Sequence, residues 1–151
     1  MASQLRDITL PVPPAHAYGL VRTSGNEIPK FRPTRDDPVS FSLAWSKGWG
    51  WSNPVDVKAT VYQGPDPTTS LIRYEASILA LADPFGFTTK TLDQFIGHLH
   101  AHHQAMLSNT PAPPPPKNTH DVKVNVIILA VLFGLMFLMC AGVGAIALVN
   151  G

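Results

Sequence analysis

The chain has 151 residues, enough for one domain of ordinary size with an additional segment. Its 11 Lys and Arg nearly balance its 10 Asp and Glu, and the resulting net charge of +1 argues against nucleic acid as a partner. The single cysteine, Cys140, excludes a disulfide framework and a thiolate metal cluster.

The first thirty residues predict a strand, a short helix and a weaker strand. Residues 8–12, ITLPV, are mostly apolar and β-branched, which favours a strand. Residues 14–21, PAHAYGLV, indicate a short helix that begins at a proline. A weak strand is expected at residues 27–31.

Three runs that alternate between apolar and polar side chains follow, at residues 39–46, 55–62 and 71–80. In the first of them Val39, Phe41, Leu43 and Trp45 would share one buried face. The connections contain Gly, Pro, Asn and Asp, so the three runs predict an antiparallel meander.

Residues 88–107 predict the last helix of the domain, with Thr88 or Thr89 as its N-cap. Its apolar side chains fall on one face that would lie across the sheet. We therefore expect an α+β fold over residues 1–107, a small two-layer antiparallel sheet with a helix packed on it, in the order β-α-β4-α. This element order resembles TATA-binding-protein-like and helix-grip topologies, and no residue motif extends the resemblance to function.

A proline-rich linker is predicted at residues 108–123, because proline removes backbone donors and prevents regular structure. Four successive prolines, Pro113 to Pro116, favour polyproline II and would make the linker a semi-rigid spacer. The alternative is a docking site for a proline-reading module.

A single transmembrane helix with a short tail is expected within residues 124–151. Residues 126–149 carry no charge, and a helix of that length exceeds the roughly 30 Å of a bilayer core. Lys117 and Lys123 precede this segment, which predicts a tail-anchored protein with a cytoplasmic N-terminal domain and its C-terminus outside.

A stripe of mostly small residues along this segment predicts helix packing against a second copy or another membrane-protein subunit. The stripe consists of Ala130, Gly134, Leu138, Ala141 and Ala145. The alternative is that it reflects only the abundance of Gly and Ala in membrane helices.

The sequence HLHAHH, residues 98–103, is the most unusual local feature. His98 and His102 are four residues apart on one helical face, as two zinc ligands would be. A closed site needs four ligands, and no HExxH arrangement is present. We therefore expect no metal or other cofactor, with His98, His102 and His103 on the solvated face of the helix.

Three tryptophans surround the turn WSKGWGWS. Tryptophan is enriched at interfaces, so Lys47, Trp49 and Trp51 are candidates for a contact surface. In the alternative, Trp45 belongs to the sheet core and Trp49 or Trp51 covers its edge.

No catalytic motif is recognisable, so an enzyme is not expected. The sequence predicts a non-catalytic single-pass membrane protein, an accessory or scaffold subunit of a membrane protein complex. The alternative is a membrane-tethered module that binds lipid or a small ligand. An empty cavity on the order of 300 Å³ between sheet and helix would favour that alternative.

Overall fold

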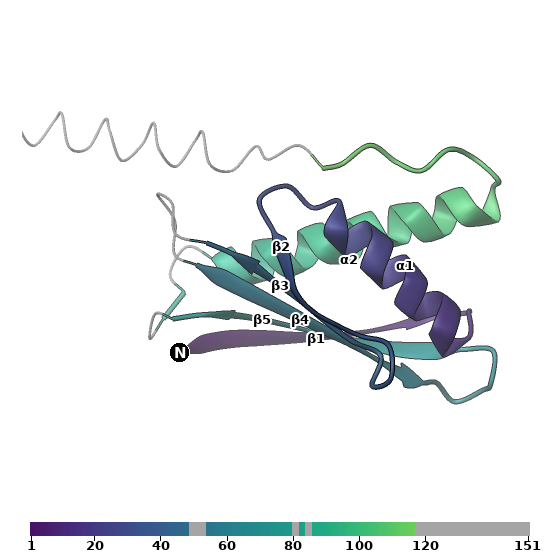
Figure 1. The fold of residues 1–151 in the computed structure, drawn as a ribbon, viewed down its shortest axis with the longest axis horizontal. Coiled ribbons are helices and arrows are strands. Elements are labelled where there is room, and N and C mark those ends of the chain that lie inside the picture. Colours follow the sequence, from purple (N-terminus) through teal and green to yellow (C-terminus); the bar gives the residue numbers. More distant parts are fainter. Residues whose placement is uncertain (49–53, 80–81, 84–85, 117–151) are drawn as a thin grey trace, which may run out of the picture. The chain divides into compact units, whose positions relative to one another are not determined.

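Seven elements follow one another in the order strand, helix, four strands, helix, as the sequence predicts (Figure 1). They are β1 (Ala2–Leu10), α1 (Pro14–Asn26), β2 (Arg32–Asp37), β3 (Ser42–Lys47), β4 (Val55–Gln63), β5 (Ser70–Ile78) and α2 (Phe87–Leu107). The computed structural model describes residues 1–48, 54–79, 82–83 and 86–116. The α+β fold class is therefore confirmed.

The strands form one antiparallel sheet in the order β1-β5-β4-β3-β2. Strands β3, β4 and β5 make the predicted meander. The first strand does not pair with its neighbour in the sequence: it pairs with β5, where Ala2 lies opposite Ile78 and Leu10 opposite Ser70. The first and last strands of the domain therefore lie side by side in the sheet.

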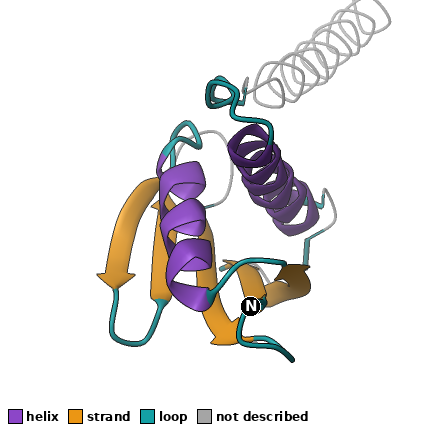
Figure 2. Ribbon diagram, turned by 90° about the vertical axis from the view of Figure 1, so that its right-hand side faces the viewer, coloured by secondary structure: helices purple, strands orange, loops and turns teal. Residues whose placement is uncertain are grey.

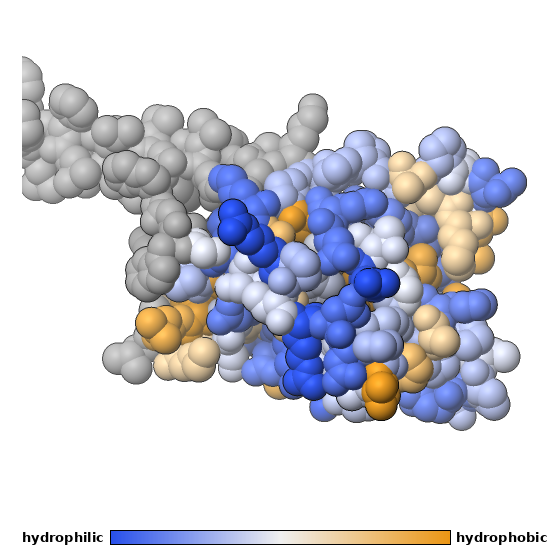
Figure 3. Space-filling view, viewed as in Figure 1, coloured by the Kyte–Doolittle hydropathy of each residue, from blue (hydrophilic) through white to orange (hydrophobic). Residues whose placement is uncertain are grey.

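Both helices lie side by side on the same face of the sheet (Figure 2). Alternate side chains of the strands face the helices. In β4 these are Val55, Val57, Ala59 and Val61, which are buried. From above, α2 contributes Leu92, Phe95 and Leu99 to the same core. The outer surface in the view of Figure 3 is mostly hydrophilic, with its hydrophobic residues in small separate groups.

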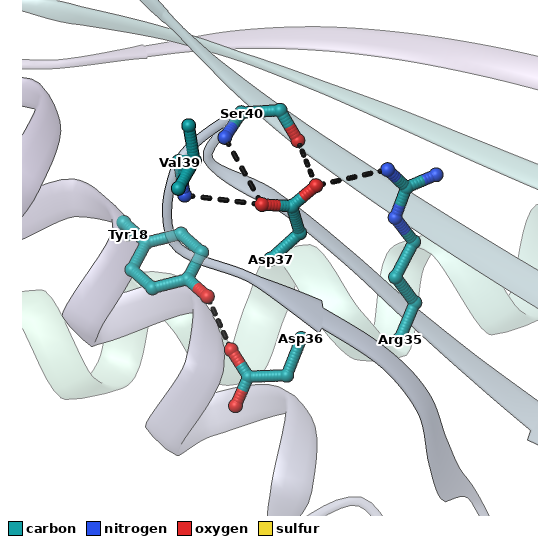
Figure 4. Close-up of polar contacts among 6 residues, drawn as sticks. All are labelled: Tyr18, Arg35, Asp36, Asp37, Val39 and Ser40. Atoms are coloured by element: carbon teal, nitrogen blue, oxygen red, sulfur yellow. Dashed lines mark hydrogen bonds and ion pairs between the residues drawn. The ribbon is translucent and has the colours of Figure 1, made fainter.

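The first strand of the meander is shorter than predicted because a turn occupies residues 38–41. Val39 is 91% exposed and Phe41 has a φ of 47°, so neither belongs to a buried strand face. The Asp37 carboxylate accepts hydrogen bonds from the backbone amides of Val39 and Ser40, from the Ser40 hydroxyl and from Arg35 (Figure 4). These bonds, the Ser40 hydroxyl first, hold the pKa of Asp37 far below its usual value.

The weak strand expected at residues 27–31 lies instead at β2, Arg32–Asp37. Its side chains are almost all exposed, so it has no apolar pattern by which to be found. The hydroxyl of Tyr18 in α1 donates a hydrogen bond to Asp36 (Figure 4), and Arg22 forms an ion pair with the same carboxylate at 2.7 Å. Burial and this hydrogen bond raise the pKa of Tyr18 to about 12. These contacts attach α1 to the edge of the sheet.

The cap of α2 also differs from the prediction. Gly86 occupies the N-cap position in the left-handed conformation, with a φ of 64°. The Asp83 carboxylate accepts hydrogen bonds from the amides of Phe87 and Thr88, at 2.8 and 2.7 Å, and from the Thr88 hydroxyl at 2.6 Å. An aspartate in the preceding loop therefore satisfies the free amides of the helix start, so Thr88 is itself a donor in the cap.

The chain divides into two compact units, Met1–Lys117 and Asn118–Gly151. The second unit, and with it the predicted segment 126–149, lies outside the residues that the structure describes. Within the described ranges, neither helix combines the length and the apolar character that a membrane crossing requires. The predicted boundaries of the linker and of the C-terminal segment stay predictions.

Candidate functional site

Four aromatic rings gather between the sheet and α2. Phe95 is their centre, with ring centroids 5.1 Å from Phe31, 5.3 Å from Trp45 and 6.3 Å from Tyr74. Trp45 and Phe95 are each 1% exposed and Tyr74 is fully buried. Ring pairs at these separations are favourable contacts, so the centre of the domain is an aromatic cluster.

The Tyr74 hydroxyl is the unusual group in this cluster. It is buried, and it has no hydrogen-bond partner among the described residues. Burial raises the pKa of Tyr74 well above its usual value, so the group is a neutral phenol at physiological pH. A buried hydroxyl without a partner costs about 1–3 kcal/mol, so a strand position that needs only packing would favour phenylalanine.

The other polar ring in the cluster is satisfied. The indole Nε1 of Trp45 donates a hydrogen bond of 2.8 Å to the side-chain oxygen of Asn26. This places Trp45 in the sheet core, which is the alternative that the alternation of its strand favours. Tyr74 is therefore the polar group of this cluster that has no hydrogen-bond partner among the described residues.

A second polar site lies where the end of α1 meets α2. One carboxylate oxygen of Glu27, Oε2, lies 3.0 Å from His98 Nε2 and 2.8 Å from His102 Nε2. The two imidazole rings meet edge to face, with centroids 4.7 Å apart. The three ligand atoms all lie within 4.8 Å of one another, so these residues could together hold a metal ion.

Burial differs between the members of this cluster. The His98 and His102 side chains are only 4% and 6% exposed, whereas that of Glu27 is 34% exposed. Burial of Glu27 works to raise the pKa of its carboxyl group, but the hydrogen bonds from His98 and His102 outweigh it, and the pKa is lowered. The cluster therefore holds an anionic carboxylate next to two imidazoles.

The prediction that His98, His102 and His103 form a solvated face is wrong, because all three are buried. The helix has two neighbours, the sheet below it and α1 beside it, so its buried surface is wider than one apolar stripe. His100 alone of the HLHAHH histidines is exposed. The Nε2 atom of His103 has no partner within the described part of the chain.

The remaining predicted site residues are not brought together. Lys47 ends β3, while Trp49 and Trp51 lie outside the described residues, as do Ala130, Gly134, Leu138, Ala141 and Ala145. Glu27 and Tyr74 are the residues that sequence reasoning missed. The alternation of β5 predicts that Tyr74 is buried. No feature of the sequence indicates that its hydroxyl has no partner.

An open hollow of about 450 Å³ lies on the outer face of the sheet, away from both helices. The polar side chains of its lining include Ser46, Asp56, Lys58, Glu75 and Ser77. This is not the cavity between sheet and helix that was expected to favour ligand binding, because in that layer the aromatic rings are in contact.

No family model and no curated protein matches the chain. Solved structures do resemble it. The di-domain ARO/CYC BexL from the BE-7585A biosynthetic pathway matches with a TM-score of 0.53 and 15% identity, over 74% of this chain and 48% of BexL. The chain thus spans about half the length of that protein.

Two single-domain proteins match over almost their whole length. Ara h 8.0201 has a TM-score of 0.53 and 13% identity, over 71% of this chain and 98% of its own. An uncharacterised protein from Bacillus thuringiensis has a TM-score of 0.52 and 12% identity, over 70% of this chain and 99% of its own. At these identities the resemblance establishes the fold alone, a helix-grip α+β arrangement in which a long helix lies across an antiparallel sheet.

These findings correct the predicted function. The sequence predicted a single-pass, tail-anchored accessory or scaffold subunit of a membrane protein complex, or a membrane-tethered binding module. The N-terminal unit instead has the fold of ARO/CYC domains and of Ara h 8.0201, and no membrane-crossing helix is found within the described ranges. The prediction was wrong because it gave residues 126–149 more weight than the fold of residues 1–107.

Proposed function

We propose that the domain binds a small, largely apolar ring compound between the sheet and α2, with the Tyr74 hydroxyl as its hydrogen-bonding group. The single observation that carries this proposal is the buried Tyr74 hydroxyl without a partner in an aromatic cluster. A ligand oxygen or nitrogen at this point would offset the cost of about 1–3 kcal/mol that the lone hydroxyl imposes.

The surroundings of Tyr74 define the class of ligand. Phe31, Trp45 and Phe95 present ring faces and edges, which favour flat apolar molecules over charged or strongly hydrated ones. The fold that the chain shares with the ARO/CYC protein BexL supports a ring compound as the ligand. The rings are in contact without a ligand, so α2 moves away from the sheet to admit one.

We further propose that the domain binds without catalysing a reaction, since its sequence has no recognisable catalytic motif. A ring compound incubated with the protein would then be recovered unchanged. Chromatography and mass spectrometry of the recovered compound test this, and formation of a new product in the presence of the protein would contradict it.

The decisive experiment compares two ligands that differ by one hydroxyl. Naphthol and naphthalene are titrated into the full-length chain by calorimetry and by tryptophan fluorescence. The wild-type chain is expected to bind naphthol about tenfold more tightly than naphthalene, because only naphthol pairs with Tyr74. In Tyr74→Phe the preference disappears, while the free energy of unfolding without ligand rises by about 1 kcal/mol.

Tyr62→Phe is the matched control, because Tyr62 is 45% exposed in β4 and takes no part in the aromatic cluster. It is expected to leave both the naphthol preference and the stability unchanged. Equal affinity for the two compounds in the wild-type chain, or a preference that survives in Tyr74→Phe, would disprove the proposal.

A further inference from the structure

The cluster of Glu27, His98 and His102 is separate from the aromatic cluster in its chemistry. It contains no aromatic ring other than the imidazoles, and it lies where α1 ends and α2 passes beside it. We infer that these three residues bind one divalent transition-metal ion, a function independent of the binding of a ring compound.

The geometry of the three ligand atoms carries this inference. Bonds from a first-row transition metal to imidazole nitrogen and carboxylate oxygen are about 2.0–2.2 Å long, which places neighbouring ligand atoms roughly 2.9–3.4 Å apart. The distances from Glu27 Oε2 to the two Nε2 atoms are 3.0 and 2.8 Å. Two of the three separations therefore lie near the spacing that an ion requires, and all three ligand atoms lie within 4.8 Å of one another.

The burial of the ligands favours an ion at this point. His98 and His102 lie four residues apart on α2 and are fixed by packing, so they are held in place before binding. Glu27 lies at the end of α1 and supplies the third ligand atom. The two imidazole nitrogens that meet at one carboxylate oxygen place three donor atoms around one point, which is the arrangement that coordination of a single ion requires.

The ligand set indicates the type of ion. Two imidazoles and one carboxylate suit zinc, iron(II), cobalt(II) or nickel(II), whereas magnesium and calcium prefer all-oxygen sites. Three protein ligands leave at least one coordination position for water or an exchangeable ligand. The partly exposed Glu27 marks the side from which that ligand would reach the ion.

The test uses untagged full-length protein, because a histidine tag would itself bind metal. The chain is treated with a chelator, dialysed, and titrated with Zn²⁺ by calorimetry and with Co²⁺ by visible absorption. One ion per chain is expected, with the d–d bands of cobalt held by nitrogen and oxygen ligands. Zn²⁺ is also expected to raise the unfolding temperature, since it binds only the folded chain.

Three variants locate the site. Glu27→Gln, His98→Ala and His102→Ala are each expected to weaken Zn²⁺ binding by roughly 100-fold, because each removes one of only three ligands. Glu27→Gln keeps a hydrogen-bond acceptor for both histidines, so it separates loss of metal from loss of fold. His16→Ala and His100→Ala remove exposed histidines and should leave Zn²⁺ binding unchanged.

Failure to bind Zn²⁺ or Co²⁺ in a one-to-one ratio would overturn the inference and leave the cluster as a hydrogen-bonded contact between α1 and α2. Binding that persists unchanged in Glu27→Gln and His98→Ala, or that is lost in His100→Ala, would overturn it as well. Neither outcome bears on naphthol binding, because Tyr74 is intact in all of these variants.

Discussion

At the scale of single residues, Trp45 sets the distance between α1 and the sheet. Gly25 lies against the indole so closely that a Cβ atom there would stand 2.3 Å from a ring carbon. Asn26, the next residue, accepts the hydrogen bond of the indole. The ring is 1% exposed and held on both sides, so it has no room to move away from a larger side chain at position 25.

Replacement of two glycines of α1 by alanine is therefore expected to change the free energy of unfolding in opposite directions. Gly25→Ala is expected to lower the free energy of unfolding by about 1–3 kcal/mol, because the new methyl group overlaps the Trp45 ring. Gly19→Ala is expected to raise it by roughly 0.5–1 kcal/mol, since no atom lies within 4 Å of its Cβ position and alanine favours the helix. Urea unfolding followed by circular dichroism measures both. Equal effects would show that the close contact with Trp45 is absent in solution.

At the scale of elements, α2 begins where a loop carboxylate supplies the cap. Asp83 pairs with two amides and one hydroxyl of the first turn. Partial burial works to raise the pKa of Asp83, but these hydrogen bonds, first from Thr88, outweigh it and the pKa is lowered. The charged carboxylate therefore stabilises the native state, and its protonation weakens it.

Removing the cap is expected to destabilise the domain in a pH-dependent manner. Asp83→Ala should lower the free energy of unfolding by about 1–2 kcal/mol near neutral pH. Because the folded pKa lies below the unfolded value of about 3.9, the contribution of Asp83 is complete above that value. It is lost as the pH falls through the folded pKa, so wild type and variant converge in acid.

Urea unfolding of both proteins between about pH 6 and pH 2.5 measures this difference. Asp93→Ala, which removes an exposed carboxylate later in the same helix, is the control and should show no comparable loss. A difference that stays constant down to the lowest pH would refute the assignment of Asp83 as a charged cap.

The sequence predicts those elements in which apolar side chains recur at a regular interval. Strands β4 and β5 alternate cleanly because one face of each is buried, and the α2 helix carries a regular apolar stripe. Strand β2, RPTRDD, and most of β1 have exposed side chains on both faces, so hydrophobicity does not mark them. Their positions depend on pairing with distant strands, which no local pattern records.

At the scale of the whole molecule, the N-terminal strand completes the sheet beside the last strand. Residues 2–10 pair with residues 70–78, and buried Leu10 joins the core below the helices. The Ser70 hydroxyl donates a hydrogen bond of 2.6 Å to the carbonyl of Val12. The ion pair between Asp7 and Arg73 is solvent-exposed and adds little, so the pairing depends on backbone bonds and apolar contact.

Deletion of residues 2–10 is therefore expected to abolish cooperative unfolding of the domain. The deletion would expose the edge of β5 that pairs with β1, and it would uncover one side of the core. The expected loss of stability is comparable with the roughly 5–15 kcal/mol that stabilises a typical domain. Thermal unfolding followed by circular dichroism measures it. Leu5→Ala changes a side chain that is 59% exposed in the same strand and should preserve the transition. A sharp transition in the deletion variant would contradict the role of β1.

The candidate sites depend on this same long-range assembly, which is why the sequence predicts them only in part. Residues 98 and 102 attract attention because two histidines four apart share a helical face. Their partner Glu27 is 71 residues away from His98 in the sequence and is identifiable only once α1 and α2 lie side by side. Likewise, the inward direction of Tyr74 follows from the alternation of β5, whereas the lack of a partner for its hydroxyl depends on residues that are distant in the sequence.

Asn26 and Glu27 are consecutive residues that face different layers of the domain. Asn26 is bound to the indole in the sheet, while Glu27 is bound to the imidazoles of α2. Since their Cα atoms are about 3.8 Å apart across one rigid peptide unit, the backbone of one residue cannot shift far without carrying that of the other with it. A movement of the backbone at this one turn therefore alters the hydrogen bond of the indole and the contacts of the two imidazoles together.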